Sequence, residues 1–442
     1  MLLAKFLSLM VDLLPGRSKL NTLRLAIKGL NYRVIGTGIR FTVPLFIIAV
    51  SSEYELGLYY LSLSILLTAS SFLGLEMGYF FSTRHLSKDN FEKKYILNFL
   101  IIRCMKISLL ICFLILALYI FTNGVDIPPY IFLIPILFSL EACSYEMGRF
   151  FWNIGEVHQA SFRDFIKSIF FIIAIYASLI LSDSVLSVYS IAILILSNLC
   201  IIFYEVRKWG NFRDLFSNFF VLKENWAYEW INFLKILLNA CGPQFVQNQV
   251  IGLTMLFEKV FITNLLGLSA QGIFSFIYSV MQTSAALFLM PSAAKTKQII
   301  ISDHPNFDDP KIYLAAIRYL PVVILFMVIF ATISYFAIPI LGAIMDKDIG
   351  TGIFIIVVAV FFSASCNAFM SSVAPLYSHP GRWIRANIIS LIMLLPLLFV
   401  TIFYEFINLD LVILCYVAIA LSAIGQVAVR CIFFTKSFKR LS

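Results

Sequence analysis

Charged residues are scarce in this sequence. Only 13% of its 442 residues are Asp, Glu, Lys or Arg, whereas 61% are hydrophobic and 44 residues are Phe. A soluble globular domain carries about 25% charged residues, so this chain has too few polar side chains to cover a soluble fold. The composition therefore argues against a soluble enzyme and predicts an integral membrane protein.

Cysteine and histidine are too few and too scattered to predict a metal or redox site. The eight Cys form no Cys-x-x-Cys pair, and most lie in apolar runs, where Cys acts as a small hydrophobe. The four His, at positions 85, 158, 304 and 379, fall in predicted loops without metal-ligand spacing. A Gly-rich phosphate-binding motif is also missing. We therefore expect no metal, no cofactor and no ATP hydrolysis by this chain.

The apolar residues gather in long uninterrupted runs. Each run is about 20 residues or longer, enough for a helix to cross a hydrocarbon core of about 30 Å. Closed barrels are the other structure that satisfies the backbone in lipid, but their strands alternate apolar and polar residues, and these runs do not. We predict an all-α integral membrane protein with about twelve transmembrane helices. The predicted spans are 30–50, 57–82, 95–121, 129–152, 165–182, 185–204, 240–264, 270–293, 313–342, 351–377, 383–404 and 410–434.

The connections between these spans alternate in charge. Every second connection is rich in Lys and Arg, as are both ends of the chain, whereas the others are short and mildly acidic and contain only one basic residue, Lys347. Because Lys and Arg remain on the cytoplasmic side, the pattern predicts that both termini are cytoplasmic. The net charge of +9 then reflects attraction to anionic lipid headgroups, and we expect no nucleic-acid partner.

The spans divide into two groups of six around the longest connection. Gly57 and Tyr59 at the start of the second span match Gly272 and Phe274 at the start of the eighth. Because six is even, the two halves are parallel repeats, as in transporters that bind substrate in a central cavity between two lobes. The predicted units are an interfacial segment (1–29), a first lobe (30–204), a cytoplasmic linker (205–239), a second lobe (240–435) and a tail (436–442).

Two short motifs mark the start and the end of the second span, Glu53–Tyr59 (EYELGLY) and Leu73–Gly78 (LGLEMG). With the twelve spans and the six-plus-six repeat, they resemble the polysaccharide transporter family of the multidrug/oligosaccharidyl-lipid/polysaccharide exporter superfamily. The resemblance implies a flippase of the bacterial inner membrane. Its substrate would be a polyprenyl-pyrophosphate-linked glycan, such as an O-antigen or capsule repeat unit. Membrane lipids, a polysaccharide polymerase and a chain-length regulator are the implied partners.

Five of the basic residues within or near spans of the first lobe are candidates for a function, because a charge there needs a partner or a role. Arg33 and Arg40 share one face of the first span, Arg103 and Lys106 share a face of the third, and Arg149 lies in the fourth. Arg binds phosphate oxygens with a fork of donors, so all five are candidates for binding the pyrophosphate. The alternative is an ion pair with a carboxylate or a position at the membrane interface.

Carboxylates in the spans are the candidates for ion coupling. Glu141 lies near the middle of the fourth span, where it could exchange a proton or pair with Arg40 or Lys106. Glu76 is expected at the membrane interface. The seventh span carries a polar stripe that must face protein or water. It consists of Gln244, Gln247, Asn248, Thr254 and Glu258, of which Gln247 is a substrate-binding candidate and Glu258 an ion-coupling candidate.

Two other functions stay open. A cation-coupled multidrug antiporter of the same superfamily should have carboxylates and few cations in its cavity, and the excess of Arg and Lys argues against it. A membrane oligosaccharide polymerase or ligase resembles this chain in its number of spans, but it needs a large external loop with Arg or His. The longest external connection predicted here is about ten residues and has neither. A transporter is therefore favoured over an enzyme.

Overall fold

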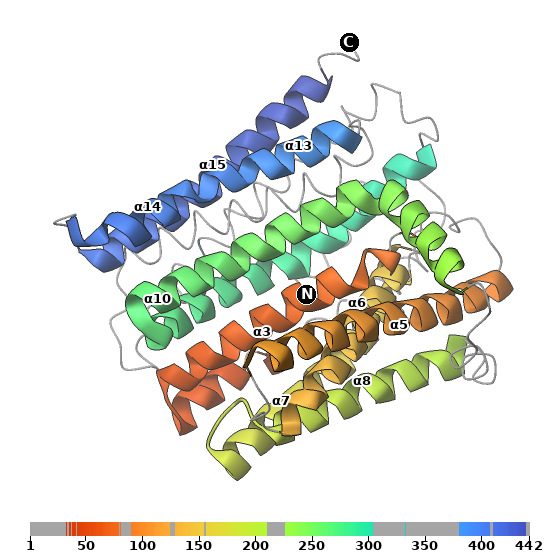
Figure 1. Cartoon of the computed structure of the whole chain (residues 1–442), viewed down its shortest axis with the longest axis horizontal. Helices are drawn as coiled ribbons and strands as arrows, with labels where there is room; N and C mark the ends of the chain where they lie inside the picture. Colours follow the sequence, from red (N-terminus) through yellow and green to blue (C-terminus); the bar gives the residue numbers. More distant parts are fainter. Residues whose placement is uncertain are drawn as a thin grey trace, which may run out of the picture.

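The computed structural model is a bundle of long helices (Figure 1). It describes residues 35–36, 38–40, 42–78, 90–123, 129–153, 156–209, 226–303, 380–406 and 410–438, with the single residues Tyr32, Phe80 and Thr332. Within these ranges there is no strand, and seven helices are long and apolar enough to cross a membrane. The all-α membrane fold is therefore confirmed. The predicted ninth and tenth spans, 313–342 and 351–377, lie outside the described residues.

Among the described residues of the first half, five long helices follow the helical residues 42–50. They are α3 (Glu53–Gly74), α5 (Asn90–Asn123), α6 (Leu133–Asn153, after the short helix η1, Pro129–Phe132), α7 (Val157–Ser182) and α8 (Val188–Trp209). α3 begins at Ser52, whose hydroxyl accepts the Glu55 backbone N–H at 3.3 Å, and it ends at Leu75, which adopts a left-handed conformation. α7 begins at Val157, earlier than the predicted start at 165, so that Arg163 and Lys167 lie within a helix.

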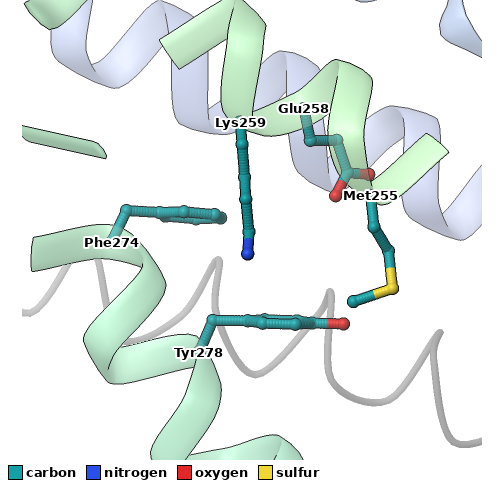
Figure 2. Close-up of a pocket in the computed structure, with 5 residues that line it drawn as sticks. All are labelled: Met255, Glu258, Lys259, Phe274 and Tyr278. Atoms are coloured by element: carbon teal, nitrogen blue, oxygen red, sulfur yellow. The ribbon is translucent and has the colours of Figure 1, made fainter. Parts of the chain in front are cut away.

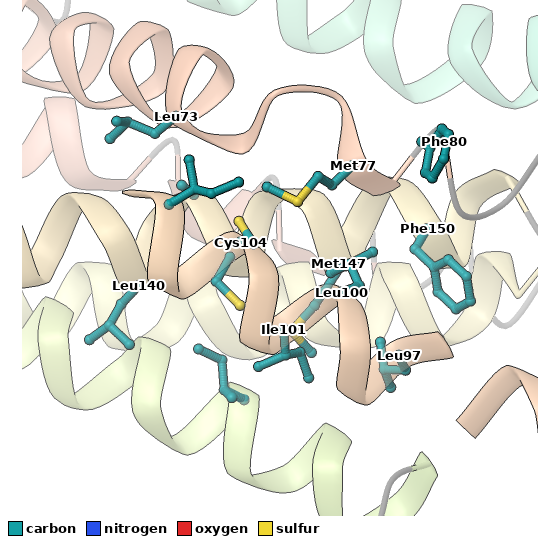
Figure 3. Packing of buried hydrophobic residues seen from close by; sticks show 14 of the residues in the cluster. Leu73, Met77, Phe80, Leu97, Leu100, Ile101, Cys104, Leu140, Met147 and Phe150 are labelled. Carbon is teal, nitrogen blue, oxygen red and sulfur yellow. The ribbon is translucent and has the colours of Figure 1, made fainter. Parts of the chain in front are cut away.

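One apolar core joins α3, α5, α6 and the first turns of α10 (Figure 3). Leu73 and Met77 from the end of α3 meet Leu100 and Cys104 of α5 and Met147 of α6, and all five are buried. These side chains surround the segment 74–78, where the backbone leaves the helix. The one charged residue of that segment, Glu76, is therefore held inside the bundle.

The second half begins with α10 (Trp226–Asp303), which reverses direction at Gly267 (Figure 1). Gly267 has φ +86° and ψ 168°, a conformation that glycine adopts far more readily than other residues, and the predicted turn between 264 and 270 is found there. The eleventh predicted span is a continuous path of α13 (Pro380–Ser390), η2 (Leu391–Leu394), α14 (Leu395–Phe403) and η3 (Tyr404–Phe406). It packs against α15 (Leu411–Phe438).

The two halves of the chain meet along α3 and α10, which form the most extensive helix contact among the described elements. At the end that the positive-inside rule predicts to be external, Gly57 lies against the backbone of Leu268. A Cβ atom at Gly272 would stand only 2.7 Å from the Gly57 nitrogen. The two glycines matched in the internal repeat therefore let the backbones touch, as small residues do between membrane helices.

Candidate functional site

A row of polar contacts runs along α3 where it packs against α10, between the two lobes. On α3 its members follow a spacing of three or four residues, which places them on one helical face toward α10. From the predicted outer end inward, the pairs are Tyr60 with Ser279 (2.8 Å), Ser64 with Lys259, Thr68 with the Gly252 carbonyl (3.4 Å) and Ser71 with Gln249 (3.4 Å). Polar groups in a membrane interior are costly without hydrogen-bond partners. Here the polar side chains of α3 and α10 are partners for each other, so they favour contact between the two lobes along this surface.

The row ends in a buried charged cluster just after α3. Glu76 and Glu146 are both 0% exposed, and Arg149 of α6 forms an ion pair with Glu76. Asn248 of α10 donates to Glu76 at 2.7 Å, so this carboxylate links the two lobes. The sequence suggested an interfacial position for Glu76; instead, the left-handed conformation of Leu75 and Glu76 (φ 51° and 61°) turns the chain and keeps the carboxylate inside.

Glycines make room for this cluster. A Cβ at Gly74 would lie 2.9 Å from the Glu146 carboxyl carbon, and one at Gly78 would meet the Glu146 backbone. The Gly78 N–H also donates to the Glu146 carboxylate at 2.6 Å. Packing therefore explains why the motif Leu73–Gly78 contains two glycines, because a side chain at either position would keep the Glu146 carboxylate away from the main chain.

Glu141 has a different partner from those suggested by the sequence. It forms an ion pair with Lys167 of α7 and accepts a hydrogen bond from Asn198 of α8 at 3.0 Å, rather than pairing with Arg40 or Lys106. Lys167 fell in a predicted span but was not singled out, because the meeting of α6, α7 and α8 is not visible in the sequence. Glu141 is thus neutralised within the first lobe.

Arg40 is exposed on the first span and lies beside α7. Its Nε donates to the Ser168 hydroxyl at 2.7 Å and its Nη2 to the Asp164 carbonyl at 3.3 Å, so both acceptors are neutral oxygens. Among the described residues, Arg40 forms no salt bridge with a carboxylate. Arg33, its predicted companion, lies outside the described residues.

The remaining candidates are spread over both lobes. On α5, Arg103 lies over the rings of Phe99 and Phe233 (4.7 and 5.1 Å to the centroids), and Lys106 is half-buried. Gln247 is buried on α10. No single site therefore brings together all the residues proposed from the sequence, and within the described ranges no group of His, Cys, Asp or Glu is arranged to hold a metal.

Glu258 is buried on α10 beside Lys259, at a small cavity (Figure 2). The cavity is lined by Met255, Glu258, Lys259, Phe274 and Tyr278. Its volume is about 10 Å³, which is about the space that one water molecule needs. It can therefore hold a water or a small ion, but not an organic substrate.

Comparison with known proteins identifies the fold. No family model matches the sequence, and no curated protein matches it. Among solved structures, a MOP superfamily transporter from Pyrococcus furiosus, described as having a binding pocket of reverse polarity that suggests a different function, matches with a TM-score of 0.63. The two are 14% identical, over 98% of this chain and 97% of that one.

Two structures described as multidrug resistance MATE family transporters of the MOP superfamily also match. An outward-facing structure gives a TM-score of 0.61 at 14% identity, covering 98% of this chain and 97% of the other. An inward-facing structure gives 0.55 at 15% identity, covering 99% and 98%. The chain therefore has the fold of the MOP superfamily transporters, an all-α membrane architecture with about twelve transmembrane helices in two lobes.

Proposed function

We propose that this protein is an alternating-access flippase of the bacterial inner membrane, with both termini cytoplasmic. Its substrate is a polyprenyl-pyrophosphate-linked oligosaccharide, carried from the inner to the outer leaflet. Arg40 carries this proposal, because its guanidinium is exposed within a predicted span and is bonded to neutral oxygens. A cation in hydrocarbon costs at least a few kcal/mol, so such a group belongs in a hydrated or ligand-filled space.

The chemistry of a pyrophosphate fits this position. A guanidinium offers a fork of donors to phosphate oxygens, and two of the Arg40 nitrogens are already oriented by α7. Arg103 and Lys106 add positive charge to the first lobe, whereas Arg149 is occupied by Glu76. We therefore propose Arg40 as the principal headgroup contact, with Arg33, Arg103 and Lys106 in support.

A cation-coupled multidrug antiporter is the second candidate. The outward- and inward-facing structures with this fold are described as multidrug transporters, which favours that function. Arg149 and Lys167 are neutralised by carboxylates, which reduces the positive charge on which the first proposal depends. In an antiporter, the buried Glu258 would bind the coupling cation, and the same cavity can serve ion coupling in a flippase.

Deletion of the gene in its host, followed by complementation, tests the proposal. We expect the deletion strain to lose surface polysaccharide and to accumulate complete single lipid-linked repeat units on the inner leaflet. In the complemented strain, Arg40→Ala should give an export rate at least about tenfold below that of the parent protein. One lost charge-assisted contact is worth about 1.5–3 kcal/mol. Arg40→Lys should restore export in part, because the charge remains.

Arg207→Ala is the matched control, because Arg207 is exposed in the last turn of α8, at the predicted cytoplasmic surface. It should export normally. Unchanged export by Arg40→Ala at normal abundance would refute the headgroup role. An unchanged surface polysaccharide in the deletion strain, together with increased sensitivity to cationic drugs, would favour the antiporter instead.

A further inference from the structure

A single guanidinium is shared by two buried carboxylates at the end of α3. Arg149 pairs with Glu76, and its Nη1 also lies 3.6 Å from Glu146 Oε1. If both carboxyl groups were ionised, these three side chains would have a net charge of −1. An uncompensated charge inside a membrane protein is costly, so the cluster is best neutralised when one carboxyl group holds a proton.

The hydrogen bonds indicate which carboxyl group that is. Both oxygens of Glu76 are engaged, one by Arg149 and the other by Asn248 of α10. Glu146 accepts the Gly78 N–H through Oε2, and its Oε1 lies 3.6 Å from Arg149 Nη1, beyond hydrogen-bond distance, although the side chain is 0% exposed. The open position for a proton is therefore Glu146 Oε1.

The surroundings of Glu146 contain few other titratable groups. Tyr145 of α6 and Cys104 of α5 lie close enough to interact electrostatically with the carboxyl group. Arg163 of α7 packs against Gly148, which is about 200° around α6 from Glu146 and so on the other side of the helix. The cluster's described contact with α10 is the neutral Asn248. Arg149 and Glu76 are therefore the charges that respond directly to a proton on Glu146.

We propose that Glu146 is a proton-binding site whose occupancy controls the contact between the two lobes. The proposal rests on the alternating-access function proposed above and assigns a coupling site outside the candidates Glu141 and Glu258. With a proton on Glu146, Arg149 pairs with Glu76 alone and keeps the Glu76 carboxylate in place to accept the hydrogen bond from Asn248. When Glu146 releases the proton to water, its carboxylate competes for the same guanidinium, and the Glu76–Asn248 link between the lobes weakens.

Infrared spectroscopy of the intact protein in lipid nanodiscs tests the site itself. We expect the carbonyl absorption of a protonated carboxylic acid at neutral pH, with one component lost in Glu146→Gln. Glu141→Gln is the control, because the Glu141 carboxylate is already neutralised by Lys167 and should contribute no such absorption. Identical carbonyl absorption in the parent protein and in Glu146→Gln would overturn the proposal.

A disulfide between the lobes tests the coupling. A Cβ at Gly252 would stand 3.9 Å from the Thr68 Cβ, within the range that a disulfide needs, so Thr68→Cys with Gly252→Cys reports this contact. The cross-linking rate is divided by that of a thiol pair within one lobe, which removes the effect of pH on thiol reactivity. We expect this ratio to fall about fivefold or more as the pH is raised. In Glu146→Gln the ratio should stay constant. The same pH dependence in both proteins would overturn the coupling.

The two proposals can fail separately. If the carbonyl absorption and the pH-dependent cross-link both depend on Glu146 while the protein transports neither lipid-linked glycan nor drug, the proton site stands and the proposed function falls. If transport of the glycan is established but Glu146→Gln changes neither measurement, the flippase stands and this site is refuted.

Discussion

Replacing Gly57 by Ala should push the lobes apart at their predicted external end. A Cβ at Gly57 would overlap the Leu268 carbonyl oxygen and stand 2.7 Å from its carbon, whereas ordinary contacts begin near 3.4 Å. Both atoms are backbone, so no side chain can rotate away and one helix must move by about 1 Å. Overpacking of this kind costs about 1–3 kcal/mol. If only the contacting state bears this cost, the population of separated lobes rises about 5- to 150-fold.

Thiol labelling measures this separation. Ser275 is 1% exposed on α10, one turn after Gln271, which also lies beside Gly57. In a Ser275→Cys background, we expect Gly57→Ala to raise the labelling rate of this thiol at least about fivefold. The native Cys200 is exposed, so its labelling rate is an internal reference for the reactivity of the reagent. The extent of labelling at each site is measured by mass spectrometry.

Gly242→Ala is the matched control, because a Cβ at this helical glycine would meet nothing within 4 Å. It should leave the labelling rate unchanged. An unchanged rate in Gly57→Ala would refute the conclusion that the glycine contact holds this end of the lobes together. An equal increase in both variants would also refute it, because the effect would then be general loosening.

Two further predictions concern the stability of the first lobe, measured as thermal unfolding in detergent. Lys167→Met should destabilise the protein by about 3–5 kcal/mol, because it leaves the Glu141 carboxylate unpaired. The double variant with Glu141→Gln should recover part of this loss. If it recovers none, the buried ion pair is contradicted. Gly148→Ala should cost about 1–3 kcal/mol, because its Cβ would displace the buried Arg163 guanidinium from the Ser144 carbonyl and from Asp164. Gly38→Ala, whose Cβ has open space, should cost less, and equal effects would argue against this displacement.

The fold was largely predictable because it follows from solvation. A lipid-exposed segment must be apolar over the whole bilayer thickness and must satisfy its own backbone, so length and hydropathy are enough to predict helices. The turn at Gly267 was predicted within a few residues. The start of α7 was placed too late, because Arg163 and Asp164 read as loop residues. Arg163 is buried there because it pairs with Asp164 and donates to the Ser144 carbonyl of α6.

The ion pairs were much less predictable. The sequence placed Glu141 near the middle of the fourth span, but it suggested Arg40 or Lys106 as its partner, whereas the structure has Lys167. It also suggested an interfacial position for Glu76, which is buried. Spacing along one helix shows which residues share a face. It does not show which helix that face meets, because neighbouring helices come from distant parts of the chain.

By itself, the sequence determined that this is a membrane-embedded helical bundle, because hydropathy acts on each segment separately. It also located the repeat that contains Gly57 and Gly272. Only the tertiary structure decided that these two glycines touch, that Asn248 of one lobe binds Glu76 of the other, and that Glu146 is left with an open oxygen. Those outcomes depend on how α3, α6 and α10 approach in space, since the burial and pairing of a charge are properties of the packed assembly.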